Sequence, residues 1–311
     1  MSAIAGVREW ATRRQLYVDN LKAILVAGII AGHAAIGYAG STDAWSYSDV
    51  REATLSPVTE SIVLALLLFA GFVIPLLFLI AGLYTPGSLQ RKGIGGYVRD
   101  RLLRLGVPFL LFAVLLWPLL EYGLFRWLGT APEFVQYWRA EGTLDTGVLW
   151  FVGALLLFSL AYAGWMRLGP LAAWTGPFEL RARHLVLLTA AVTVLTFLVR
   201  LVVPLEADNP IIDLNLWEWP ACAALFGLGV VCSRDGWLQA VPGKLRRQGG
   251  AVGILAVAAL VVFVATTQTL GIQQEQLAGG WAWPPLVFVL LERALSRSSP
   301  PPGCSAQPSG T

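Results

Sequence analysis

Eight apolar runs, of which the sixth and eighth are short, constrain the fold of this chain more than any other feature. Helices of about 20 apolar residues are long enough to cross the hydrocarbon core of a bilayer. Only 13% of the 311 residues are charged and 56% are hydrophobic, whereas soluble domains carry roughly a quarter charged residues. The sequence therefore predicts an all-α integral membrane protein, a polytopic helical bundle of about eight transmembrane helices. The predicted spans are Leu21–Tyr38, Ile62–Leu83, Leu105–Leu120, Val148–Trp165, Leu185–Val203, Trp219–Cys232, Ala251–Thr267 and Trp281–Leu291.

The basic residues gather in alternate connections between these runs. Most of the 22 Lys and Arg residues lie on one side, and the opposite connections are acidic and hold only Arg51, Arg126 and Arg139. Cytoplasmic loops collect Lys and Arg, so we expect a multi-pass protein of the cell membrane with both termini in the cytoplasm. The net charge of +3 gives no reason to expect a nucleic-acid partner.

The sequence predicts one transmembrane domain with two short ends. Residues 1–20 form a cytoplasmic N-terminal segment, 21–295 form the transmembrane domain, and 296–311, rich in Ser, Pro and Gly, form a disordered low-complexity tail. In the longest connection, Phe134, Tyr137 and Trp138 share one helical face, which predicts a short interfacial helix. The three cysteines have no metal-ligand or redox spacing, so no metal site is expected.

His33 stands inside the first predicted span, in the segment GIIAGHAAIG. It stands twelve residues after Leu21, a rise of about 18 Å, which places it beyond the midplane of a core about 30 Å thick. An ionisable side chain at that depth points to a functional site. The structural alternative is a neutral histidine that makes one interhelical hydrogen bond.

Lys22 precedes His33 by eleven residues, which is close to three helical turns, so both lie on one face about 16 Å apart along the axis. This arrangement suits a long substrate with an anionic head at the cytoplasmic end and a reactive end in the membrane. A lysine at the start of a span is also common for reasons of topology alone.

Three arginines are further candidates. Arg101 and Arg104 are three residues apart on one helical face, where they could hold phosphates through bidentate hydrogen bonds or act as a topology signal that contacts anionic lipid head groups. Arg200 lies near the outer end of the fifth predicted span. It either snorkels to the outer surface or faces an internal cavity.

Four segments of the chain resemble the acyltransferase 3 family of membrane proteins. They cover most of residues 13 to 240, and the first two are fairly specific in combination. The first resembles the family's opening Tyr-x-Asp-x-Leu-Arg stretch followed by a His, and the second its span that leads into an Arg-rich connection. The segments are RRQLYVDNLKAILVAGIIAGHAAIGY, LLFLIAGLYTPGSLQRKGIGGYVRDRLLRLGVPFLL, GVLWFVGALLLFSLAYA, and LTFLVRLVVP with LFGLGVVCSRDGWL.

The resemblance implies an enzyme that moves an acyl group, often acetyl, from acyl-CoA to a hydroxyl of a carbohydrate or another envelope compound. Acyl-CoA (acetyl-CoA) is then a co-substrate, no cofactor is bound permanently, and membrane lipids are the remaining partners. By the same resemblance, His33 is the general base or proton relay, and Lys22, Arg101 and Arg104 hold the donor phosphates. Arg200 serves the outer acceptor side or an oxyanion.

The sequence departs from the family pattern at two places. Lys22 stands where the family has an arginine, so the planar guanidinium fork is lost there. The family also has about ten spans with a late His-containing helix, whereas here the segment WAWPPLVFVLLERAL is followed by the tail. Two other functions therefore stay open: a transporter or exporter of an envelope precursor, whose pathway His33 and Arg200 would line, and an inactive truncated copy.

Overall fold

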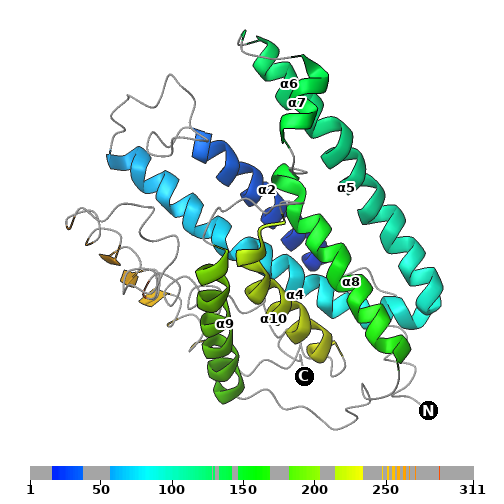
Figure 1. Cartoon of the computed structure of the whole chain (residues 1–311). Coiled ribbons are helices and arrows are strands. Elements are labelled where there is room, and N and C mark those ends of the chain that lie inside the picture. The colour runs from blue at the N-terminus through cyan, green and yellow to red at the C-terminus, as the bar shows by residue number, and fades with distance from the viewer. Residues whose placement is uncertain are drawn as a thin grey trace, which may run out of the picture. The chain divides into compact units, whose positions relative to one another are not determined.

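A computed structural model of the chain describes residues 16–37, 57–127, 133–141, 146–168, 182–203 and 214–233, with isolated positions elsewhere (Figure 1). The described elements are all helices, and this part of the chain contains no strand, which confirms the all-α prediction. The chain divides into two units, Met1–Leu77 and Phe78–Thr311.

The first unit contains helix α2 (Leu16–Gly37) and the beginning of α4 (Pro57–Arg101). Helix α2 covers most of the first predicted span, and its 22 residues give a length of about 33 Å. Its buried residues Val18, Leu25 and Ile29 follow helical spacing, while Ile24 and Ile30 on other faces are exposed. A helix that is apolar on its exposed faces as well is typical of a membrane span.

Helix α4 reverses direction at Gly93, which interrupts it with φ 68° and ψ 168°. This backbone conformation is open to glycine and strained for other residues. Beyond the break, Lys92 Nζ lies 2.7 Å from Asp100 Oδ2, although eight residues of uninterrupted helix would separate the two by about 12 Å along the axis. The segments 78–92 and 94–101 therefore form the two arms of a helical hairpin.

The second arm of the hairpin continues into a long rod with two wide π-helical turns. The rod consists of η1 (Leu102–Gly106), α5 (Val107–Leu111), η2 (Phe112–Leu116) and α6 (Trp117–Trp127). Pro108 stands in the first turn of α5, directly after the first π-helical turn. The wide turn accommodates a residue that has no backbone N–H to donate.

Three described segments are long and apolar enough to cross a membrane: Val73–Leu124, Gly147–Leu168 and Arg183–Val202. The first has 52 residues, which in a straight helix would measure about 78 Å, more than twice the thickness of a hydrocarbon core. The reversal at Gly93 divides it into two helical arms, which coincide with the second and third predicted spans.

The remaining described helices match the next predicted spans closely. Helix η3 (Gly147–Leu149) leads into α8 (Trp150–Leu168), and α9 (Ala182–Val202) follows the fifth predicted span. Helix η5 (Leu216–Glu218) leads into the short α10 (Trp219–Cys232), which has the predicted bounds of the sixth span. The seventh and eighth predicted spans fall largely outside the described residues, so the total of about eight stays a prediction.

The core of the second unit forms where α4, α8 and α10 meet. The ring of Phe158 in α8 contacts the rings of Phe78 and Trp219 edge to face, with centroids 5.4 and 5.3 Å away, an arrangement aromatic rings favour. Gly82 in α4 lies against the backbone of Phe226, and Gly229 in α10 against that of Leu79. A Cβ at either glycine would collide with a carbonyl oxygen, so the two small residues allow the helices to touch.

The predicted short helix is present as α7 (Phe134–Glu141). The hydroxyl of its buried Tyr137 donates a hydrogen bond of 2.6 Å to Glu121 of α6, so the connection folds back on the rod. Its location at a membrane interface stays a prediction. Of the two predicted end segments, only residues 16–20 are described, where α2 has already begun, and residues 296–311 lie outside the described part.

Candidate functional site

His33 lies on α2 and is partly buried. Its Nδ1 atom is 2.9 Å from the carbonyl oxygen of Ile29, one turn earlier in the same helix. A carbonyl only accepts, so this hydrogen bond requires the proton on Nδ1, and in the neutral ring the lone pair is then on Nε2. The contact runs within one helix, in contrast to the interhelical bond of the structural alternative. It gives the neutral ring the tautomer that a general base at Nε2 needs.

Lys22 lies on the same helix, with Nζ 3.7 Å from Oδ1 of Asp19. Both side chains are well exposed, and an exposed pair of this kind contributes little to stability. Because α2 is continuous from Lys22 to His33, the two residues keep the three-turn separation that the sequence predicts.

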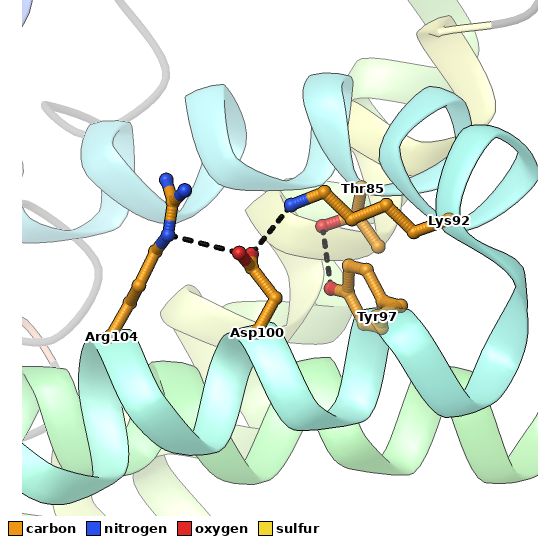
Figure 2. Close-up of polar contacts among 5 residues, drawn as sticks. All are labelled: Thr85, Lys92, Tyr97, Asp100 and Arg104. Carbon is orange, nitrogen blue, oxygen red and sulfur yellow. Dashed lines mark hydrogen bonds and ion pairs between the residues drawn. The ribbon is translucent and has the colours of Figure 1, made fainter.

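A cluster of charges joins the two arms of the hairpin at Gly93 (Figure 2). Asp100 stands at its centre. One carboxylate oxygen, Oδ2, lies 2.7 Å from Lys92 Nζ of the first arm, and the other, Oδ1, lies 2.9 Å from Nε of Arg104 in η1. The carboxylate therefore fixes two cations from opposite sides of the reversal, and we call these three residues the hairpin cluster.

Tyr97 anchors the hairpin cluster to the interior of the unit. Its side chain is fully buried with Leu89 and Ala163. Thr85 donates its single hydroxyl hydrogen to the carbonyl of Ala81 at 2.8 Å, so in the 3.4 Å contact between the two hydroxyls Tyr97 is the donor. Thr85 and Tyr97 belong to different arms (Figure 2), and this contact is a second polar link across the reversal.

Arg101 and Arg104 have different environments, although the sequence places them on one face. The guanidinium of Arg101 lies over the ring of Tyr97, 5.0 Å from its centroid, and its buried Nε has no hydrogen-bond partner among the described residues. The side chain of Arg104 is 74% exposed. Arg101 thus packs against an interior aromatic ring, which a cation–π attraction favours, and Arg104 reaches solvent.

Arg200 of α9 is only 2% exposed, so the snorkelling interpretation is wrong and the guanidinium is internal. It lies 5.3 Å from the centroid of the Trp217 ring, in η5. The turn before η5 is built around Asn215, which has a left-handed backbone (φ 47°), and Trp219 Nε1 donates a 2.9 Å hydrogen bond to the carbonyl of Leu214. A fixed turn therefore holds the aromatic ring against the buried cation.

The structure brings Lys92, Asp100 and Arg104 together and places Arg200 among other elements. Sequence reasoning counted the bases of the connection but missed Asp100 as their common partner, and Trp217 as the ring beside Arg200. The segment KGIGGYVRDR contained a signal for the role of Asp100, since glycines between two charged stretches favour a reversal of the chain that brings those stretches together. Among the described residues, no group of three His, Cys, Asp or Glu side chains could hold a metal ion.

Residues 15–299 match the family model described as an acyltransferase domain. The match covers most of the chain and confirms the resemblance carried by its motifs. The chain therefore belongs to the acyltransferase 3 family and falls in the class of membrane acyltransferases. Searches of curated proteins and of solved structures found no match.

Proposed function

We propose that the protein transfers an acyl group, acetyl in the first instance, from an acyl-CoA donor on the cytoplasmic side of the cell membrane to a hydroxyl of a carbohydrate or another envelope compound. The observation that carries the proposal is the hydrogen bond from His33 Nδ1 to Ile29. In the neutral ring this bond makes Nε2 the proton acceptor, and the predicted depth of His33 in the first span supports a functional role.

In the proposed reaction, His33 Nε2 takes the proton of the acceptor hydroxyl while the hydroxyl oxygen attacks the thioester carbonyl. The tetrahedral intermediate collapses with cleavage of the carbon–sulfur bond. The imidazolium returns its proton to the departing CoA thiolate, so the products are the ester and free CoA. No redox change and no further reactant are needed.

The cations of the chain take the other roles. Arg104 is exposed, Arg101 stands three residues before it, and both would bind donor phosphates, together with Lys22. Arg200 is buried against Trp217 and would stabilise the oxyanion or hold the acceptor, because a fixed cation in a low-dielectric site acts strongly on developing charge.

The test is transfer from radiolabelled acetyl-CoA in membranes that contain the intact protein. His33→Ala should lower the rate by about 100-fold or more, the usual contribution of a general base. The matched control is His184→Ala, the other of the two histidines, which lies on α9 beside Arg183. The control should retain activity. Inserted wild-type protein that yields no acylated product would contradict the proposal.

Transport of an envelope precursor is the second candidate function. The burial of Arg200 in an apolar helix favours transport as much as it favours acyl transfer. The two functions differ in what His33→Ala abolishes. Loss of the ester product supports transfer, whereas an unchanged ester yield with loss of movement across vesicle membranes supports transport.

A further inference from the structure

The hairpin cluster is arranged so that Asp100 holds Arg104 by one edge of its guanidinium. The contact uses Nε, at 2.9 Å, and no described residue hydrogen-bonds to the two terminal nitrogens. Figure 2 shows these two nitrogens pointing away from the carboxylate. Since the side chain is 74% exposed, the terminal fork is open to solvent, which is the geometry that binds a phosphate in a bidentate manner.

Lys92 is held in a similar way. Its ammonium carries three hydrogens, one of which is used by Asp100 at 2.7 Å, and about a third of the side chain is exposed. The carboxylate therefore places two cations side by side without covering either one. Because they come from opposite arms of the reversal at Gly93, the carboxylate also fixes the arms relative to each other at this point.

We propose that Asp100 is a positioning residue of the donor site: it orients Arg104 and Lys92 toward the phosphate groups of acyl-CoA and does not contact the donor itself. This inference rests on the proposed function and adds a residue to it. Long basic side chains lose conformational freedom when they bind a ligand, and a side chain that is already oriented loses less.

For removal of the Asp100 carboxylate, the proposal and simple electrostatics predict changes in phosphate affinity of opposite sign. Asp100 is an anion beside a site for anions, so its removal raises the local positive charge and by Coulomb attraction strengthens phosphate binding. If the carboxylate instead orients the two cations, its removal weakens binding. The sign of the change in affinity therefore decides between the two roles.

The experiment measures binding of coenzyme A to the purified full chain in lipid nanodiscs by titration calorimetry. Asp100→Asn should weaken binding by about tenfold, the scale of a charge-assisted hydrogen bond, and Asp100→Glu should recover part of the loss. The control Glu121→Gln removes an equal charge from α6, where the carboxylate pairs with Tyr137, and should leave the affinity unchanged. Equal or tighter binding by Asp100→Asn overturns the proposal.

Kinetics separate positioning from a general structural effect. With acetyl-CoA, Asp100→Asn should raise KM and leave kcat unchanged, whereas with acetyl-pantetheine, which has no nucleotide phosphates, neither parameter should change. A fall in kcat with both donors would indicate distortion of the fold and would overturn the positioning role. In a double-mutant cycle, Arg104→Gln should remove most of the effect of Asp100→Asn, and additive losses would show that the two residues act independently.

These results also separate the inference from the proposed function. Wild-type protein that binds coenzyme A but forms no acylated product contradicts the proposed function, and the affinity comparison stays valid. Equal affinity of wild type and Asp100→Asn in an active enzyme overturns only the role of Asp100. Absence of coenzyme A binding by the wild type overturns both.

Discussion

Arg104 and Arg200 carry the same charged group in two opposite environments of the second unit. Arg104 is 74% exposed and bound to the carboxylate of Asp100 through one nitrogen. Arg200 is 2% exposed and lies over the ring of Trp217. The first is held by an ion pair that water can reach, and the second by an aromatic face and by the helices around it.

The difference indicates what each arginine can do. An exposed cation attracts a charged ligand from solution, and its strength depends on salt. A buried cation has already lost its hydration, so negative charge that develops near it is stabilised strongly, and loss of the groups that contact the cation lowers stability. Under the proposed function, the exposed Arg104 would capture the donor and the buried Arg200 would act on the reacting groups.

The largest expected effect is on catalysis at the buried arginine. Arg200→Ala should lower the rate of acetyl transfer by about 100-fold, as expected for loss of a group that stabilises an oxyanion. Arg200→Lys keeps the charge but loses the planar contact with Trp217 and should restore only part of the rate. Initial rates in membranes with matched protein amounts provide the measurement, and an unchanged rate in Arg200→Ala would remove this residue from the reaction.

A smaller effect is expected on stability at the aromatic partner of the buried arginine. Trp217→Leu should lower the free energy of unfolding by about 2 kcal/mol, because it removes a cation–π contact from a desolvated cation. The matched control is Trp165→Leu in α8, whose side chain is 57% exposed and which should melt like the wild type. Thermal unfolding in detergent compares them, and equal melting temperatures for all three proteins would show that the stacking is not stabilising.

The smallest effect is expected at the exposed arginine. Arg104→Lys should raise KM for acetyl-CoA about threefold, because lysine keeps the charge and loses the bidentate fork, and should leave the melting temperature unchanged. The increase should shrink as salt rises from about 0.05 to 0.5 M, since exposed charges are screened. A change in melting temperature without a change in KM would show that Arg104 contributes to stability and not to donor binding.

The sequence predicted the helices of the described part well, because apolar runs mark where a chain crosses a membrane. It did not predict where the helix of the second span ends. Run boundaries at Leu83 and Leu105 indicated a connection of 21 residues, whereas the structure keeps it helical on both sides of Gly93. Charged and polar residues such as Gln90, Arg91 and Lys92 are good helix formers, so the end of an apolar run is not the end of a helix.

The candidate site was predictable as a set of charges and not as a geometry. The positions of Arg101, Arg104 and Arg200 are evident from their spacing, but their environments depend on residues brought close by folding. Asp100 meets Lys92 only because the chain reverses between them, and Trp217 meets Arg200 across the connection between α9 and η5. The orientation of His33 by the Ile29 carbonyl is set within its own helix, but the sequence does not specify a side-chain rotamer.

The contact between Gly82 and Gly229 has a consequence for biogenesis. About 150 residues separate the two glycines, so at usual rates of translation α10 leaves the ribosome on the order of 10 s after α4. During that interval the glycine face of α4 lacks the backbone of α10 that covers it in the folded chain. The short α10 (Trp219–Cys232) therefore covers this face late, and a stalled or delayed synthesis between the two helices leaves an exposed face that quality-control proteases can recognise.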